Sequence, residues 1–169
     1  MLVAITGGTG FVGSHTVVRL LAHGHVPRLL VRSPAKAARV LGILGVDLAT
    51  VELVEGDMAD AATVARWLDG ADAVIHAAAS VGVTGPKVDL VAQNVLGTQN
   101  VVGAAVQRGI DPVIHVSTVA VFVPPDQPVI TPEGRLASPR TAYGRSKLEA
   151  ERFARGLQAD GAPVTIVYP

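Results

Sequence analysis

The chain has 169 residues, enough for one domain with a buried core and too few for two complete ones. Apolar residues make up 49% of it and charged residues 17%, which excludes a disordered chain. The 14 basic residues balance the 14 acidic ones, so charge gives no support to nucleic acid or an anionic membrane as a partner.

Short apolar runs typical of strands alternate along the chain with longer segments of helical period. This order predicts right-handed βαβ units around a parallel sheet, and therefore a doubly wound α/β fold with helices on both faces. Most of the strands are continuously apolar, as expected for strands that are buried on both faces. The expected strands are 2–6, 26–31, 50–55, 72–76, 112–116 and 164–168. The expected helices are 11–23, 34–41, 60–69, 87–109 and 141–159, the third with Asp60 as its N-cap and Gly70 as its stop.

A glycine-rich turn, TGGTGFVG from Thr6 to Gly13, follows the first expected strand and leads into a helix. This is the context of a dinucleotide-binding fingerprint, although a glycine-rich turn can also occur for local reasons. Gly7 would make the tight turn, Gly10 would let the backbone approach a pyrophosphate, and Gly13 would let the helix pack close to the strand. The pyrophosphate would bind N–H groups at the positive end of the helix dipole. A P-loop is excluded, because no Lys-Ser or Lys-Thr pair follows the glycines.

The end of the second expected strand bears on which dinucleotide would bind. NAD sites usually have Asp or Glu there to accept hydrogen bonds from the ribose hydroxyls, whereas this chain has Arg32, with Ser33 and Lys36 nearby. A guanidinium group pairs well with a 2′-phosphate. We therefore predict NADP as the cofactor, with NAD as the alternative. Arg32 could instead simply lie in solvent.

Tyr143 and Lys147 begin the last expected helix, and their spacing of four puts them on one face, one turn apart. An ammonium group near a phenol favours the phenolate and lowers the phenol pKa from about 10 toward the range of a general acid or base. A carbonyl or alcohol substrate would need such a group. The alternative is that Lys147 pairs with Glu151 on a solvated helix face while Tyr143 only packs.

Together these motifs resemble the extended short-chain dehydrogenase/reductase family, of the NAD(P)-dependent epimerase/dehydratase type. The resemblance runs through essentially the whole chain, and the joining of TGxxGxxG to YxxxK is specific. Shorter matches are GDM at Gly56–Met58, HAAA at His76–Ala79, Asn94, and HVST at His115–Thr118. The resemblance implies a Rossmann-type fold and an NAD(P)-dependent enzyme.

The resemblance also implies roles for single residues. Tyr143 would be the catalytic acid/base, and Lys147 would lower its pKa and hold the nicotinamide ribose. Thr118, rather than its neighbour Ser117, would hydrogen-bond the substrate oxygen, and Asn94 would belong to the proton relay. The cofactor-binding residues would be Gly7, Thr9, Gly10, Phe11, Val12, Gly13, Arg32, Lys36, Asp57, Met58, Ala77, Ala78, Ala79, Tyr143 and Lys147.

Several of these residues also have purely structural interpretations. Thr118 could be an ordinary strand terminus, Asn94 a polar position on an exposed helix face, and Asp57 a turn former. His76 and His115 end buried strands, and we expect them to pack or form hydrogen bonds rather than bind a ligand. No paired His, Asp or Glu spacing indicates a metal site, and none is predicted.

The expected reaction is hydride transfer between nicotinamide and a carbonyl or secondary alcohol carbon, with Tyr143 moving the proton. A reductase acting on a hydrophobic ketone or aldehyde, a small-molecule substrate, is the first choice, and a nucleotide-sugar epimerase or dehydratase is the second. The rival from another class is a non-catalytic sensor that binds NADP. The presence of Tyr143, Lys147 and Thr118 together argues against a pure sensor.

We expect residues 1–169 to form an NAD(P)-binding domain and the C-terminal substrate-binding region to be absent from the chain. The proline-rich segment 122–140 has no periodicity, and loops of that length are usually functional or mobile. The sequence departs from the family pattern at residues 121–124, so the shape of this loop is left open. A homodimer could form through helices 87–109 and 141–159.

The location of the protein is inferred from what the sequence lacks. Cysteine is absent, which excludes disulfides and cysteine nucleophiles and fits a reducing compartment. The sequence has no stretch of 18 consecutive apolar residues, and no basic segment at its start leads into a long apolar run. We therefore expect a cytoplasmic protein with no membrane or nucleic-acid partner.

Overall fold

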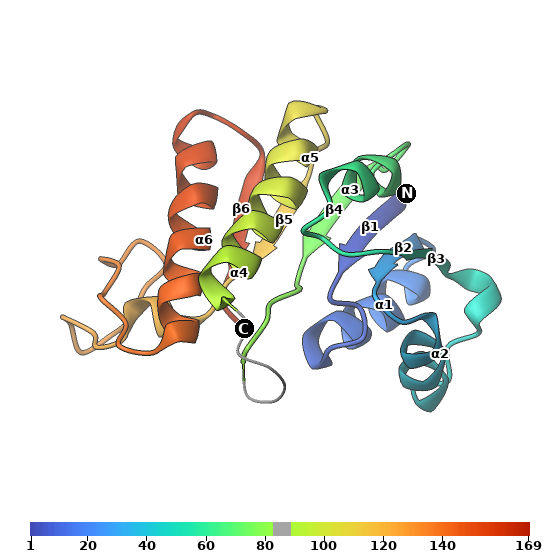
Figure 1. Cartoon of the computed structure of the whole chain (residues 1–169), viewed down its shortest axis with the longest axis horizontal. Helices are drawn as coiled ribbons and strands as arrows, with labels where there is room; N and C mark the ends of the chain where they lie inside the picture. Colours follow the sequence, from blue (N-terminus) through green and yellow to red (C-terminus); the bar gives the residue numbers. More distant parts are fainter. Residues whose placement is uncertain (83–88) are drawn as a thin grey trace.

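The computed structural model describes residues 1–82 and 89–169 and is built around a six-stranded sheet (Figure 1). All of its strand pairs are parallel, and the spatial order is β3-β2-β1-β4-β5-β6. The strands are β1 (Leu2–Thr6), β2 (Val26–Val31), β3 (Glu52–Glu55), β4 (Ala73–His76), β5 (Val113–Val116) and β6 (Val164–Val167). The chain runs outward from β1 to one edge, crosses back to β4 and runs outward again, so the predicted doubly wound fold is confirmed.

Helices cover both faces of this sheet. They are α1 (Phe11–Ala22), α2 (Pro34–Ile43), α3 (Ala61–Trp67), α4 (Leu90–Thr98), α5 (Ala104–Gln107) and α6 (Ala142–Ala159). On one face, Val17 of α1 and Leu41 of α2 are fully buried in a cluster with Ile5, Leu29 and Ile75 of the strands. Successive strand residues point to opposite faces, so their immediate neighbours form the core of the other face.

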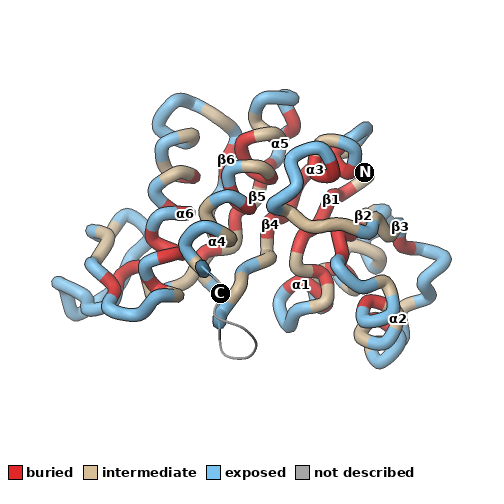
Figure 2. Tube along the Cα trace, viewed as in Figure 1, coloured by how far each residue is buried: buried red, intermediate tan, exposed pale blue. Residues whose placement is uncertain are grey.

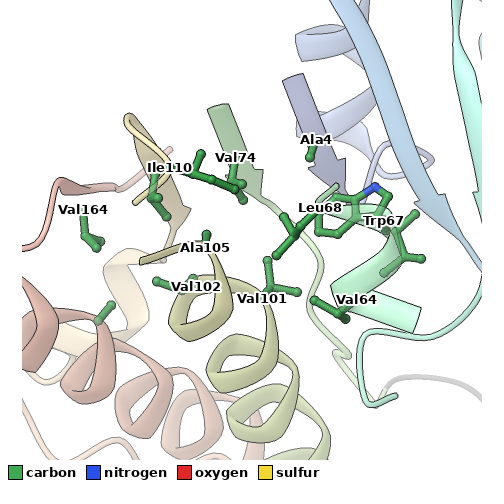
Figure 3. Close-up of a cluster of buried hydrophobic side chains, with 13 residues drawn as sticks. Ala4, Val64, Trp67, Leu68, Val74, Val101, Val102, Ala105, Ile110 and Val164 are labelled. Carbon is green, nitrogen blue, oxygen red and sulfur yellow. The ribbon is translucent and has the colours of Figure 1, made fainter. Parts of the chain in front are cut away.

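The second face carries the larger core, formed with α3, α5 and α6 (Figure 3). Trp67 of α3 is fully buried there near Val74 and Ala105, and its indole N–H donates to the carbonyl oxygen of Arg28 at 3.2 Å. Burying a large apolar side chain stabilises the fold by about 1.5–3 kcal/mol, and the hydrogen bond removes the penalty of an unpaired indole N–H. Figure 2 shows that buried residues follow the strands and the helix faces turned toward them.

The expected helix at 87–109 differs from the structure in its middle. Its first two positions lie outside the described residues, α4 begins at Leu90, and a π-helical segment (Gln99–Gly103) separates α4 from α5. A π turn closes its hydrogen bonds one residue later than an α turn, which the period of apolar residues does not reveal over so short a segment.

Both ends of α3 lie close to those of the expected helix 60–69. Asp60 caps α3 by accepting a hydrogen bond from the N–H of Ala62 at 3.0 Å, as predicted. Gly70, the expected stop, has a positive φ of 67° just beyond the helix.

The third strand begins later than the expected 50–55. The carboxylate of Asp47 accepts from the N–H of Ala49 at 3.0 Å, and this caps a 3₁₀ turn at Leu48–Thr50 that delays β3 to Glu52. Short Asp-capped turns of this kind compete with an extended backbone, and they mark the boundary here.

The segment after β5 starts with a 3₁₀ turn (Val119–Phe122) and then runs without helix or strand to Thr141, all within the described part of the chain. One backbone hydrogen bond, from the N–H of Ala137 to the carbonyl of Val121 at 2.8 Å, folds its far part back toward its start. Proline has no N–H to donate, which suits a segment outside the sheet.

None of the helices in the described part of the chain combines the length and apolar character that crossing a membrane requires.

Candidate active site

A cavity of about 220 Å³ opens at the carboxyl ends of the strands, between β1 and β4. The winding of the sheet reverses at this point, and such crevices are where doubly wound folds bind ligands. Its lining comes from the last residues of β1 and β2, from the segments that follow β1, β2, β3 and β4, and from Gln93 of α4. The lining residues are Thr6, Gly7, Thr9, Gly10, Leu30, Val31, Arg32, Lys36, Gly56, Asp57, Met58, Ala59, Ala77, Ala78, Ala79, Ser80 and Gln93.

Two glycines of the first turn are required by the protein's own packing. Gly7 has a positive φ of 74°, and a Cβ atom there would lie 2.6 Å from the backbone of Ala77 and Ala78. A Cβ atom on Gly13 would lie 2.2 Å from the carbonyl oxygen of Gly7. The tight turn and the close approach of α1 to it are therefore confirmed.

Gly10 differs from these two glycines because a Cβ atom there would make a single tight contact rather than overlap the backbone. The nearest atom to a Cβ atom there is the carbonyl oxygen of Gly7 at 3.3 Å, and Gly10 itself lines the cavity. It is the N-cap of α1, where no side chain caps the helix and the first turn, Phe11 to Ser14, carries no acidic residue. The positive end of this helix is therefore free to receive an anion at the cavity.

Two cations line the cavity beyond β2. Arg32 and Lys36 are both exposed, and neither is in an ion pair with any described residue. Ser33, between them, is the N-cap of α2 and accepts from the N–H of Lys36 at 3.2 Å. This cap fixes the start of the helix that carries Lys36 and so keeps its backbone beside Arg32.

The opposite wall of the cavity is formed by Asp57 and Met58. The carboxylate of Asp57 accepts from the N–H of Ala59 at 2.9 Å, so its interpretation as a turn former holds together with its place in the cavity wall. Asn100, in the π-helical segment, donates from Nδ2 to the carbonyl oxygen of Met58 at 2.9 Å. A Cβ atom on Gly97 would lie 2.7 Å from Sδ of Met58, so α4 and this wall are in close contact.

Lys147 of α6 is buried, with 3% of its surface exposed, and its Nζ donates to the carbonyl oxygen of Val116 at 2.9 Å. Thr141 caps the helix by accepting from the N–H of Gly144 at 3.0 Å, which fixes where the Tyr143–Lys147 turn begins. Burial lowers the pKa of Lys147 to about 8, because the charged form loses its hydration, and the nearby Glu151 opposes part of that shift.

The alternative in which Lys147 and Glu151 pair on a solvated face is wrong. Glu151 is also fully buried, and its ion pair is with Arg155, at 2.9 Å, one turn further along α6. The hydroxyl of Tyr168, just beyond β6, donates to the same carboxylate. Lys147 and Glu151 belong to the buried face of α6, together with the alanines Ala150 and Ala154.

Tyr143, in the first turn of α6, and Thr118, after the carboxyl end of β5, are both half-buried. Thr118 follows β5 and caps the 3₁₀ turn, accepting from the N–H of Ala120 at 3.3 Å. Tyr143 precedes Lys147 by one helical turn, and the bond from Lys147 to Val116 fixes this end of α6 against the end of β5. No hydrogen bond joins the side chains of Tyr143 and Lys147 within residues 1–82 and 89–169.

The side chain of Asn94, on α4, forms hydrogen bonds with both Ser80 and Ser146. It is buried, so an exposed position on the helix is excluded. Its Oδ1 accepts from the N–H of Ser80 at 2.7 Å, and its Nδ2 donates to the carbonyl of Ser80 and to Oγ of Ser146, each at 2.9 Å. Asn94 therefore connects a wall of the cavity to α6.

The two histidines at the strand ends stack with their ring centroids 5.5 Å apart. His76 is hydrogen-bonded on both ring nitrogens, whereas neither nitrogen of His115 has a partner among the described residues. Burial lowers the pKa of His76 well below its ordinary range and that of His115 to about 3, so both rings are neutral near pH 7. Both therefore pack or form hydrogen bonds, as expected. In the described part of the chain, no group of three or more His, Asp or Glu side chains could hold a metal ion.

Most of the residues predicted to bind a cofactor line the one cavity. Those that do not are Phe11, Val12 and Gly13 of α1, and Tyr143 and Lys147 of α6. The sequence interpretation missed seven lining residues, which are Thr6, Leu30, Val31, Gly56, Ala59, Ser80 and Gln93. All of these except Gln93 lie within two positions of a predicted cofactor-binding residue. Extending each predicted motif by one or two residues would have found them.

Comparison with known proteins gives a consistent set of relatives. The sequence pattern of the NAD dependent epimerase/dehydratase family matches residues 3–169. A dTDP-glucose 4,6-dehydratase of Streptomyces antibioticus is 35% identical, over 91% of this chain and 48% of its own length. A 4-hydroxy-2-methyl-3-oxo-4-farnesyl-3,4-dihydroquinoline-1-oxide ketoreductase of Stigmatella aurantiaca is 31% identical, over 96% of this chain and 47% of its own length.

Solved structures agree with these relatives. The UDP-glucose 4-epimerase of Bifidobacterium longum, solved in complex with NAD+ and UDP, is similar with a TM-score of 0.82 and 28% identity, over 99% of this chain and 52% of that one. The chain thus spans about half the length of the curated relatives that it matches.

Proposed function

Because the chain belongs to the NAD dependent epimerase/dehydratase family, we propose that it binds a nicotinamide dinucleotide in the cavity at the glycine turn and serves hydride transfer. Residues 1–169 are then the dinucleotide-binding domain of an oxidoreductase. The residues that recognise the substrate belong to a further region, as the roughly twofold greater length of the relatives suggests.

The observation that carries this proposal is the contrast of Gly10 with Gly7 and Gly13. A Cβ atom on Gly7 or Gly13 would overlap the protein backbone, whereas a Cβ atom on Gly10 would make one tight contact, at 3.3 Å, beside the cavity. Internal packing restricts Gly10 less than the other two, and we attribute the absence of a side chain there to a ligand that approaches the backbone closely. The uncapped N-terminus of α1 beside it suits the pyrophosphate of a dinucleotide.

We assign NADP as the preferred cofactor, although the solved relatives are described with NAD. Arg32 and Lys36 line the cavity beyond β2, where an NAD site usually has an acidic side chain. Neither cation is engaged in an ion pair with a described residue, so both can reach a 2′-phosphate. The same cations would leave the ribose hydroxyls of NAD without a carboxylate acceptor.

In the proposed reaction, the bound nicotinamide supplies or accepts the hydride. Tyr143 donates or accepts the matching proton at the substrate oxygen, and Thr118 donates a hydrogen bond to that oxygen. Lys147, one helical turn along α6 from Tyr143, would contact the nicotinamide ribose of the bound cofactor. Asn94, bonded to Ser80 and Ser146, fixes α4 between the cavity and α6.

A reductase acting on a ketone or aldehyde is our first choice, and a nucleotide-sugar epimerase or dehydratase is the second. The second is supported by the similarity to a UDP-glucose 4-epimerase that holds NAD+ and UDP. The two differ in their use of cofactor, because a reductase consumes it in each turnover and an epimerase or dehydratase returns it.

Titration of the purified chain with NADPH and NADH, followed by the fluorescence of the reduced nicotinamide, tests the proposal. We expect both to bind and NADPH to bind more tightly. Binding of neither, with the chain folded by circular dichroism, would contradict the proposal.

A further inference from the structure

A continuous path of buried hydrogen bonds runs beneath the candidate site from the glycine turn to the helix that carries Tyr143. It starts at Thr6, at the end of β1, and passes through His76, Thr98 and Asn94 to Ser146. All five residues are buried, none with more than 2% of its surface exposed. His76 and Thr98, in the middle of the path, have no part in the proposed reaction.

The carbonyl oxygen of Asn94 fixes the donor and acceptor of each hydrogen bond in the first half of the path. The hydroxyl of Thr98 lies 2.8 Å from the carbonyl oxygen of Asn94, and a carbonyl can only accept, so Thr98 donates its one hydroxyl hydrogen there. Thr98 must therefore accept from Nε2 of His76, 3.1 Å away. The neutral ring of His76 then carries its proton on Nε2 and accepts at Nδ1.

The other side of the ring is fixed by the same logic. The hydroxyl of Thr6 lies 2.7 Å from Nδ1 of His76 and donates to it. The same hydroxyl oxygen accepts from the N–H of Ala78 at 3.2 Å. Ala78 lies in the cavity wall, so the path begins at the proposed cofactor site.

The second half of the path reaches the backbone of Tyr143. Nδ2 of Asn94 donates to Oγ of Ser146, and that hydroxyl donates to the carbonyl oxygen of Tyr143 at 2.7 Å. Asn94 also holds both backbone groups of Ser80, which is a second residue of the cavity wall. Every side-chain donor and acceptor along the path thus has a partner, and the direction of each bond is fixed.

We propose that His76 and Thr98 are positioning residues, which hold the Ala78–Ser80 wall of the cavity in register with Tyr143 on α6. The role rests on the proposed function, because it matters where cofactor and phenol must meet. A fully satisfied buried path has a single arrangement, whereas loss of one member leaves a buried donor or acceptor unpaired and lets both ends shift. His76 joins strand β4 to helix α4, and Thr98 joins the ring to the residue that bonds both Ser80 and Ser146.

The first test needs no cofactor. Nitrogen-15 NMR of the five histidines distinguishes the two neutral tautomers of each ring, and His76 is assigned with the His76→Phe variant. We expect His76 to be neutral at pH 7 with its proton on Nε2. A proton on Nδ1, or a charged ring, would overturn the path as described.

The second test uses Thr98→Val, which replaces the hydroxyl by a methyl group of similar size, with Thr63→Val as its matched control. Thr63 is also buried, with 5% of its surface exposed against 1% for Thr98, and hydrogen-bonded, but it lies on α3 outside the path. Incorporated 3-fluorotyrosine reports on Tyr143, because the chain has only two tyrosines and Tyr168 serves as the internal reference.

We expect Thr98→Val to shift or broaden the fluorine signal of Tyr143, leave that of Tyr168 in place and weaken NADPH binding about fivefold or more. Thr98→Ser should restore both, and Thr63→Val should leave affinity within about twofold, a difference below ~0.5 kcal/mol. An unchanged Tyr143 signal in Thr98→Val, or equal effects of Thr63→Val, would overturn the positioning role. Failure of the wild-type chain to bind either dinucleotide would instead contradict the proposed function, and the fluorine signals would still decide the path.

Discussion

Gly13 approaches Gly7 so closely that a Cβ atom on Gly13 would lie 2.2 Å from the carbonyl oxygen of Gly7. Gly10, between them, has its nearest neighbour at 3.3 Å from such an atom and an extended backbone with φ −90° and ψ 174°. Gly7 and Gly13 are thus required by the fold, whereas Gly10 is constrained less, by one tight contact.

Gly10→Val and Gly13→Val should therefore fail in different ways. Gly13→Val forces backbone atoms apart and should lower the free energy of unfolding by about 3 kcal/mol or more. Gly10→Val should change it by only about 1 kcal/mol, yet abolish NADPH binding, because the new side chain occupies the cavity beside the helix terminus. Urea unfolding and fluorescence titration measure the two effects. Retained NADPH binding by Gly10→Val would remove the phosphate role from this turn.

Arg32→Asp should reverse the preference between dinucleotides. The new carboxylate would repel a 2′-phosphate and accept hydrogen bonds from the ribose hydroxyls of NADH, so the ratio of the two dissociation constants should move toward NADH by about tenfold or more. Arg39→Asp is a control with the same charge change on an exposed position of α2 that does not line the cavity. If the two variants gave the same ratio, Arg32 would have no part in the site.

The buried ammonium group of Lys147 should make stability depend on pH above neutrality. Its pKa is lowered from 10.5 to about 8 in the folded chain, so between these values the unfolded chain binds more protons and stability rises with pH. From pH 7 to pH 9.5 the free energy of unfolding should increase by about 2 kcal/mol. Burial raises the pKa of Tyr168 to about 12, an opposite effect that acts mainly above pH 10.

Urea unfolding of the wild type and of Lys147→Met at both pH values measures this slope. His76 and His115, whose pKa values are lowered in the fold, should destabilise the chain only as the pH falls below about 6.5, outside this window. A slope that persists in Lys147→Met would show that another group titrates.

Tyr143→Phe separates the enzyme from the sensor. The variant should bind NADPH with a dissociation constant within about threefold of the wild type, because only the hydroxyl is removed and the ring of residue 143 is kept. Turnover of a carbonyl substrate that the wild type reduces should fall by about 100- to 10,000-fold, as expected for loss of a general acid. Full turnover in the variant would reject Tyr143 as the acid, and a biological output that needs only the bound cofactor would favour the sensor.

Features set by adjacent residues could be predicted from the sequence. The turn at Gly7 and the cap at Asp60 each depend on local steric or hydrogen-bonding preferences, and the structure confirms them. The doubly wound sheet, also confirmed, could be predicted from the alternation of strands and helices along the chain. Most of the cavity residues could be predicted from the expected strand ends, because the carboxyl ends of neighbouring parallel strands meet at one edge of the sheet.

Features set by packing between distant segments could not be predicted. Lys147 and Glu151 share one helix face, but only the docking of α6 on the sheet decides that this face is buried. The bond between His76 and Thr98 joins residues 22 positions apart, and the bond from Asn100 of the π-helical segment to Met58 joins residues 42 positions apart. Side-chain bonds of this range leave no periodic pattern in a single sequence.

A crystal structure of the chain with NADPH tests the central claim most directly. We expect the pyrophosphate at the N–H groups of the Gly10–Gly13 turn, the 2′-phosphate beside Arg32, and the nicotinamide ring next to the hydroxyl of Tyr143. A ring bound away from Tyr143, or a cofactor bound elsewhere than the cavity between β1 and β4, would contradict it.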